Sequence, residues 1–154
     1  MSANDVETRL DVLEAIEAIK RLRYTYCYSC DSYEMDEVLK LFAKDAMADF
    51  HEFGEYVGNA EIAKFYKEIV PQKMTFFVHM VSNPIIDVID SDHAKGKWYA
   101  DVPATLDGEA RWMCGRYEEE YIKEDGQWKF KVMKFFWKYE TPFDQGWVKE
   151  RLKV

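Results

Sequence analysis

The spacing of apolar residues changes at Pro71, and this change constrains the fold more than any other feature of the sequence. Before Pro71, apolar residues recur every three or four positions from Val6 to Tyr26, which is the period of an amphipathic helix. After it, apolar and aromatic residues come in short blocks separated by turn residues, which is typical of strands. Helices followed by an antiparallel sheet predict an α+β domain with the helices packed on one face of a curved sheet.

Three helices are expected in the first half of the chain. The first begins near Val6 and ends at Asp31, where the apolar stripe stops and the chain turns. The second covers Met35–Phe42. The third covers Ala60–Val70, and we expect Pro71 to end it.

Six strands are expected, at Ala46–Phe50, Thr75–Val81, Ile85–Ile89, Lys95–Val102, Glu109–Tyr121 and Trp128–Tyr139. Asp107-Gly108 and Asp125-Gly126 are typical of two-residue hairpin turns, so the last three strands should form an antiparallel meander. A length of 154 residues is that of one domain, and we assign residues 1–154 to a single domain.

The last strand is apolar on both of its alternating sets. Those sets are Trp128, Phe130, Val132 and Phe136 on one side, and Met133, Phe135, Trp137 and Tyr139 on the other. Such a strand is typically covered on both faces. We therefore expect the helices on one face and a neighbouring subunit on the other, with the alternative that these rings only close the rim of a monomer.

Charge and hydropathy exclude several classes of protein. The net charge is −8 at neutral pH, whereas a duplex-binding protein needs a basic surface, so we expect no nucleic-acid partner. No stretch approaches the ~20 apolar residues of a membrane span, and the first ten residues do not resemble a signal peptide. Three irregularly spaced cysteines favour a reducing compartment, so we expect a cytoplasmic protein.

His79 is the first candidate for chemistry, because it lies in an apolar segment on the same predicted face as Phe77 and Val81. A partly buried imidazole has a pKa that neighbours tune around ~6.5, which suits proton transfer near neutral pH. A core histidine bonded to a backbone carbonyl is the other interpretation. His79 alone does not decide between them.

Asp31 and Tyr26 lie near the end of the first predicted helix. Asp31 is either a turn residue or a carboxylate that accepts the imidazole N–H and stabilises the imidazolium, as in catalytic triads. Tyr26 either offers its phenol to a ligand or packs in the core with its hydroxyl at the rim. Both interpretations stay open at this point.

The remaining motifs do not indicate a redox, metal, nucleotide or serine-nucleophile site. Cys27-Tyr28-Ser29-Cys30 has the C-x-x-C spacing, but it closes a helix without the βαβ context of a thioredoxin, and Cys114 alone does not complete a zinc site. Phosphate-loop, dinucleotide and serine-nucleophile motifs are missing, so we expect no cofactor and no metal. We interpret the run Glu118-Glu119-Glu120 as a solvated edge.

Several of these segments also form an ordered set of motifs. They are Tyr26-x4-Asp31, Met-Asp-Glu-Val at 35–38, His79, Gly-Lys-Trp-Tyr at 96–99, Gly-Arg-Tyr-Glu at 115–118 and Glu-Asp-Gly-Gln-Trp-Lys-Phe at 124–130. Their order and spacing resemble the SnoaL-like family of the nuclear transport factor 2-like superfamily, over most of the chain. The resemblance implies a cone-shaped α+β fold and a trimer rather than a dimer.

Within that family the pattern looks most like the bile acid 7α-dehydratase and scytalone dehydratase type of lyase. The resemblance implies that Asp31 and His79 form a catalytic dyad and that Tyr26 is a third catalytic residue. A further aspartate of the bile acid enzymes falls at or beside Val102, and the basic residue of the related dehydrochlorinases falls near Met133. The chain departs from the pattern at both positions.

Three hypotheses for function follow. The first is a cofactor-independent dehydratase acting on a hydrophobic, hydroxylated polycyclic or aromatic molecule. Candidate pocket walls are Phe77, Trp98, Tyr99, Met113, Tyr117, Phe135 and Trp137, because 16% of the chain is aromatic and strand parity leaves the inward set open. The second is an isomerase or a polyketide or steroid cyclase on the same scaffold. The third is a ligand-binding or auxiliary subunit without catalysis.

Overall fold

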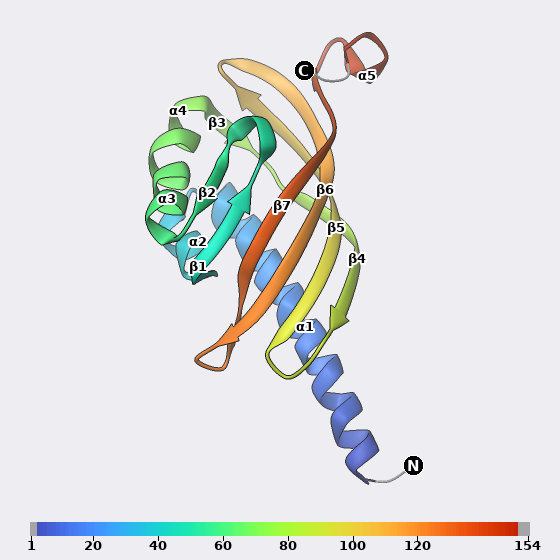
Figure 1. Ribbon diagram of the computed structural model, residues 1–154. Coiled ribbons are helices and arrows are strands. Elements are labelled where there is room, and N and C mark those ends of the chain that lie inside the picture. Colours follow the sequence, from blue (N-terminus) through green and yellow to red (C-terminus); the bar gives the residue numbers. More distant parts are fainter. Residues whose placement is uncertain (1–2, 151–154) are drawn as a thin grey trace.

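The first helix, α1 (Ala3–Asp31), ends where the sequence predicts and lies against one face of the sheet in the computed structural model, which describes residues 3–150 (Figure 1). Its C-terminal half buries Ile19 and Tyr26. Its first turns extend beyond the sheet, so that Val6 and Leu13 of the predicted stripe stay 54% and 60% exposed. Only the second half of the stripe therefore packs on the sheet.

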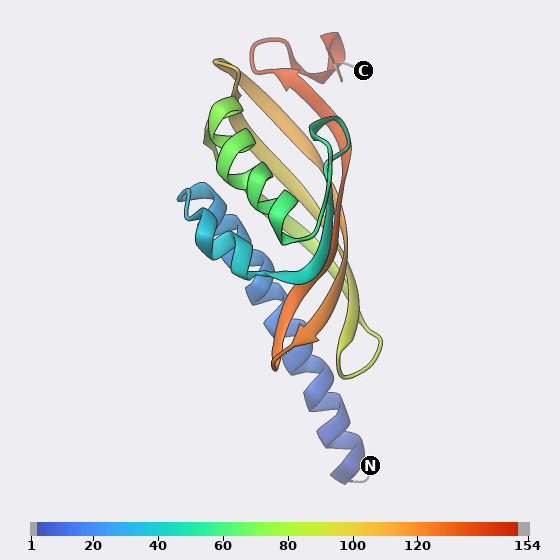
Figure 2. The ribbon, with the colours of Figure 1, turned by 60° about the vertical axis from the view of Figure 1, so that its left-hand side comes forward.

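One strongly curved sheet forms the other layer of the molecule (Figure 2). Its strands are β1 (Phe42–Asp49), β2 (Glu55–Val57), β3 (Met74–Phe77), β4 (Met80–Val88), β5 (His93–Leu106), β6 (Glu109–Glu124) and β7 (Gln127–Pro142). Their order is β2-β1-β7-β6-β5-β3, and β4 also pairs with β5. The β1–β7 pair is parallel and the other pairs are antiparallel. The sheet with helices on one face confirms the predicted fold class.

Both predicted hairpin turns are present. Asp107 and Gly108 have φ angles of 48° and 84°, and Asp125 and Gly126 have 51° and 77°. Positive φ at both central residues gives the turn the twist of the flanking strands. These turns join β5, β6 and β7 into the predicted meander.

The remaining helices differ from the predictions at their ends. They are α2 (Met35–Lys40) and a stretch made of α3 (Asn59–Lys64), a π-helical turn (Phe65–Ile69) and α4 (Val70–Lys73). The sequence did not predict α5 (Gly146–Lys149) or the 3₁₀ segment at His51–Phe53. Phe42 begins β1 instead of ending α2. The prediction that Pro71 ends the third helix is wrong, because the helical backbone continues from Asn59 through the π-helical turn and Pro71 to Lys73.

The last strand corrects the predicted assignment of its faces. Glu120 pairs with Val132 and Tyr121 with Phe130, so Lys131 forms a bulge between them. A bulge adds one residue and reverses the alternation beyond it. Phe130 and Met133 consequently both point into the core and are fully buried, although strict alternation places them on opposite faces.

Within residues 3–150, none of the helices is both long enough and apolar enough to span a membrane.

Candidate functional site

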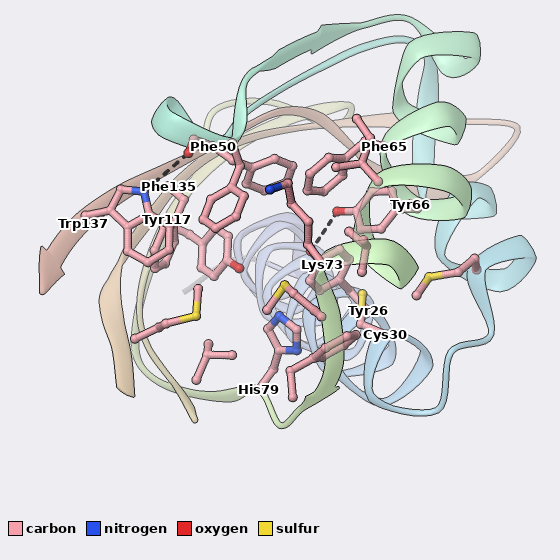
Figure 3. Close-up of a pocket in the computed structure, with 18 residues that line it drawn as sticks. Tyr26, Cys30, Phe50, Phe65, Tyr66, Lys73, His79, Tyr117, Phe135 and Trp137 are labelled. Carbon is pink, nitrogen blue, oxygen red and sulfur yellow. Dashed lines mark hydrogen bonds between the residues drawn. The ribbon is translucent and has the colours of Figure 1, made fainter. Parts of the chain in front are cut away.

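A pocket lies between the concave face of the sheet and the helical layer, where α1, α2, the π-helical turn and α4 contribute to its lining (Figure 3). It contains about 730 Å³ of empty space, including its open mouth. Six of the walls are the aromatic side chains of Phe50, Phe53, Phe65, Phe77, Phe135 and Trp137. The polar groups are few: the phenols of three tyrosines, the thiol of Cys30, the amine of Lys73 and the imidazole of His79. Such a cavity suits a largely apolar small molecule with one or two polar atoms.

His79 lies between two strands and not within one, which corrects the predicted strand Thr75–Val81. The chain leaves the ladder at Val78 and His79, between β3 and β4. This break frees the backbone N–H of His79 from the ladder, and it donates to the Asp31 carboxylate, with both oxygens 3.0 Å away. The main chain of His79 is thus anchored to the end of α1.

The side chains of the same two residues are also bonded. His79 Nδ1 lies 2.7 Å from Asp31 Oδ1. Because a carboxylate only accepts hydrogen bonds, it selects the imidazole tautomer with the proton on Nδ1. Nε2 is then left with a lone pair, on a ring that points into the pocket (Figure 3). The arrangement can accept one proton from a molecule in the pocket.

Burial controls the charge of this histidine. It lowers the pKa of His79 below its ordinary value of 6.5, while the hydrogen bond and the charge of Asp31 act in the opposite direction. Arg23 also lowers this pKa. His79 is therefore neutral at pH 7, which is the form that accepts a proton.

Tyr26 lies beside the histidine on the pocket wall. The two rings meet edge to face, with their centroids 5.8 Å apart. The Tyr26 hydroxyl oxygen is 2.8 Å from that of Tyr66. Burial raises the pKa of both phenols well above 10, so both remain protonated hydrogen-bond donors.

The predicted walls fall into two groups. Phe77, Met113, Tyr117, Phe135 and Trp137 line the pocket. These five come from β3, β6 and β7, on the inward face of the sheet.

Trp98 and Tyr99, the other two candidate walls, are not among the residues that line this pocket. Trp98 points inward but lies outside the cavity lining, where its indole N–H donates to Tyr121 and its ring meets Tyr24. Tyr99 is the next residue on β5, so it points to the outer face and is 49% exposed. Asp101 lies on that same outer set, where its carboxylate accepts from the indole N–H of Trp112, while Val102 lines the pocket.

The short helices also contribute to the pocket, which the sequence patterns did not predict. Tyr66 and Phe65 line it from the π-helical turn, and Ile69 and Val70 follow on the same side. The spacing of Ile62, Tyr66 and Ile69 is that of a helix face and could have indicated an inward stripe. Lys73 reaches the pocket from α4, with Nζ 3.7 Å from Asp107 Oδ2.

A second buried pair lies behind the pocket. Arg23 Nη1 is 2.8 Å from Glu119 Oε1, and both side chains are fully buried. The Tyr121 hydroxyl donates to the same carboxylate. The guanidinium of Arg23 stacks on the ring of Tyr117 at 3.6 Å. The interpretation of Glu119 as part of a solvated edge is wrong, because alternation along β6 turns this residue inward, between the half-buried Glu118 and the exposed Glu120.

Comparisons with known proteins identify the family of this chain. The SnoaL-like domain model matches residues 11–134. The chain belongs to the SnoaL-like family. No curated protein matches the sequence significantly.

Solved structures of the SnoaL-like fold include enzymes. A candidate scytalone dehydratase from Novosphingobium aromaticivorans is 24% identical, with a TM-score of 0.80 over 86% of this chain and 90% of that one. The hexachlorocyclohexane dehydrochlorinase LinA type 2 is 20% identical, with a TM-score of 0.82 over 88% and 93%. A candidate aromatic ring hydroxylase from N. aromaticivorans is 25% identical, with a TM-score of 0.78 over 84% and 94%.

Proposed function

We propose that this SnoaL-like protein is a cofactor-independent lyase that removes water from a hydrophobic, hydroxylated polycyclic or aromatic molecule. The observation that carries the proposal is the Asp31–His79 hydrogen bond of 2.7 Å at the wall of an otherwise apolar pocket. The structural neighbours that are named as a dehydratase and a dehydrochlorinase support the same class of reaction.

His79 is the general base in this reaction. Nε2 takes a proton from a carbon next to an activating group, and the electron pair of that C–H bond forms the new double bond as the C–O bond breaks. Asp31 holds the imidazole and stabilises its cation. A general base of suitable pKa contributes ~10²–10⁴ in rate, and the remainder comes from positioning and stabilisation of developing charge.

Tyr26 donates a hydrogen bond to the departing oxygen. The hydroxide that leaves takes up the proton that His79 removed, so one molecule of water is released and His79 returns to its neutral form. The high pKa of the Tyr26 phenol keeps its proton in place for this role at neutral pH.

The test is a screen of β-hydroxy ketones on aromatic and steroid-like frameworks, followed by mass spectrometry of the products. We expect loss of one water from at least one of them, and no loss with His79→Gln. His93 is a matched control, because it forms the same Nδ1 to carboxylate contact with Asp90 at 2.9 Å but lies 56% exposed outside the pocket. His93→Gln should retain full activity.

Other results of this screen have clear meanings. A product of unchanged mass that depends on His79 identifies an isomerase or cyclase and contradicts the elimination. Tight binding without turnover of any compound that carries both an acidic C–H bond and a leaving oxygen indicates a ligand-binding protein instead.

We also propose that three copies of this chain assemble through the outer face of the sheet. Tyr99, Arg116 and Phe136 form a row across β5, β6 and β7 on that face. Tyr99 is 49% exposed in the single chain, and an aromatic row of this kind is typical of an interface. Light scattering should give the mass of a trimer, and a monomer at micromolar concentration contradicts this proposal.

A further inference from the structure

The hydroxyl groups of Tyr26 and Tyr66 form a pair inside the pocket. Tyr26 comes from α1 and Tyr66 from the π-helical turn at Phe65–Ile69, and the two oxygens are 2.8 Å apart (Figure 3). Each hydroxyl has one proton, and the bond between them uses one of the two. Whichever oxygen is the donor, the pair keeps one proton for another acceptor.

The surroundings of the pair provide little to accept that proton. Both tyrosines are only 2% exposed, and their rings are surrounded by Phe42, Phe50 and Phe130. The thiol of Cys30, a weak acceptor, is the neighbour of the Tyr26 hydroxyl. Because a buried donor without a good acceptor is costly, the pair favours a ligand that brings an oxygen atom to this point.

The two phenols differ in their distance from the proposed base. The ring of Tyr26 contacts His79 edge to face at 5.8 Å, whereas that of Tyr66 packs on Phe50 and Phe65. A π-helical turn is uncommon and is frequent at functional sites, and here it carries Tyr66. The hydroxyl that faces a ligand held against His79 is therefore that of Tyr26.

We propose that Tyr66 is a positioning residue: its hydroxyl donates to the Tyr26 oxygen and thereby directs the Tyr26 proton to a carbonyl or hydroxyl oxygen of the ligand. Donation from Tyr66 also polarises the Tyr26 O–H bond and strengthens the bond to the ligand. The role of Tyr66 rests on the role proposed above for Tyr26, and it identifies the ligand as one with an acceptor oxygen at its buried end.

The test measures binding and needs no substrate. The probes are 2-acetonaphthone, which has a carbonyl acceptor, and 2-ethylnaphthalene, which has similar size and none. Affinity is measured by calorimetry, and the strength of the hydrogen bond by the infrared stretching frequency of the isotope-labelled carbonyl. The variants are Tyr26→Phe, Tyr66→Phe and the double variant. Tyr56→Phe is the matched control, because its hydroxyl donates to the Phe53 carbonyl and does not line the pocket.

We expect Tyr26→Phe to weaken binding of the ketone by roughly tenfold and Tyr66→Phe by roughly threefold, since one hydrogen bond is lost and the other only disordered. In both variants the carbonyl frequency should rise toward that of an unbonded ketone. In the Tyr26→Phe background, Tyr66→Phe should have no further effect on either measurement. Binding of 2-ethylnaphthalene should stay unchanged throughout, as should both probes with Tyr56→Phe.

Several results overturn the proposal. If Tyr66→Phe leaves the ketone affinity and frequency unchanged while Tyr26→Phe reduces them, Tyr66 has no positioning role and the proposed function survives. If Tyr66→Phe weakens binding of both probes equally, Tyr66 only packs against the ligand. If Tyr66→Phe weakens ketone binding as much in the Tyr26→Phe background as in the wild type, the Tyr66 hydroxyl contacts the ligand directly. If neither variant matters, or the wild-type protein does not prefer the ketone, the role of Tyr26 fails as well.

Discussion

Two acid–base pairs, one buried and one half-buried, join α1 to the sheet, and they differ in access to the pocket. Arg23 pairs with Glu119 on β6, and Asp31 pairs with His79 at the break between β3 and β4. Both side chains of the first pair are 0% exposed, whereas Asp31 and His79 retain 22% and 12%. The first pair is enclosed behind the ring of Tyr117, and the second borders an open cavity.

Two pairs of oppositely charged or ionisable side chains therefore have different roles because one is enclosed in the core and the other borders the pocket. The enclosed pair is bonded to further core groups, because Tyr121 donates to Glu119 and Trp98 donates to Tyr121. Such a network holds two elements in one arrangement. In the Asp31–His79 pair, the imidazole Nε2 has no protein partner among the described residues. Nε2 can therefore accept a proton from a ligand.

Substitutions that disrupt the Asp31–His79 pair should reduce activity most. Asp31→Asn should reduce turnover of the substrate by roughly 10³-fold, since the amide no longer selects the correct imidazole tautomer or stabilises its cation, and the equivalent change in serine proteases costs ~10⁴. His79→Ala should be as damaging, and the double variant little worse, because the two residues act as one unit. Steady-state kinetics measures this.

The exposed pair Asp90–His93 again supplies the control. Asp90→Asn should leave turnover unchanged. Near-normal activity of Asp31→Asn, or losses that multiply in the double variant, contradicts the dyad and leaves His79 as a core histidine.

The next effect breaks the enclosed pair. Glu119→Gln leaves the buried guanidinium of Arg23 without its counter-charge, and loss of one partner of a buried ion pair costs about 3–5 kcal/mol. For a chain of this length that corresponds to a fall in Tm of roughly 10 °C. Ligand affinity of the folded fraction should change little. Replacing both residues, as in Arg23→Met with Glu119→Leu, should recover part of the stability, and a further loss of Tm contradicts this account.

A third prediction concerns the pH dependence of stability and activity that arises from His79. Because the pKa of His79 is lowered in the folded state, the unfolded chain binds this proton more readily than the folded one. The corresponding stability is present above pH 6.5 and is lost as the pH falls through the folded pKa. NMR titration of the His79 ring should show a pKa below 6.5. The value of kcat/KM should decline as the pH falls through the pKa that NMR gives for His79. A pKa above 6.5 contradicts the dominance of burial.

The smallest effects come from two tryptophans of the same sheet face. Trp98→Phe removes the donor to Tyr121 in the enclosed network and should lower stability by about 1–2 kcal/mol without changing ligand affinity. Trp137→Phe alters a pocket wall and should weaken binding of 2-ethylnaphthalene by a few-fold with little change in Tm. Thermal melts and calorimetry measure both, and the reverse pattern removes the distinction between the two regions.

The local features of the fold were predictable from the sequence. The period of α1, its end at Asp31, the two Asp-Gly hairpin turns and the helix-then-sheet order all follow from neighbours in the chain. Of the candidate site, five of seven proposed walls line the pocket, as do Tyr26 and His79. The walls were proposed from their apolar and aromatic character alone, with the inward set left open, and the roles of Tyr26 and His79 were implied by the family resemblance.

Other features depend on partners far away in the sequence. The bulge at Lys131 reverses the faces of β7, and it is defined only by the pairing of β7 with β6. Glu119 is buried because Arg23, 96 residues earlier, offers a counter-charge. Neither property is encoded in the local pattern of its own strand.

By itself, the amino-acid sequence determined the α+β class, the positions of most elements and the types of residue that can move a proton. Only the tertiary structure decided which of them meet: Asp31 and His79, 48 positions apart, are brought within 2.7 Å by the packing of α1 on the break between β3 and β4. The reason is physical. Secondary structure follows from interactions between near neighbours, whereas a site depends on distances between elements, which are set by the packing of the whole core.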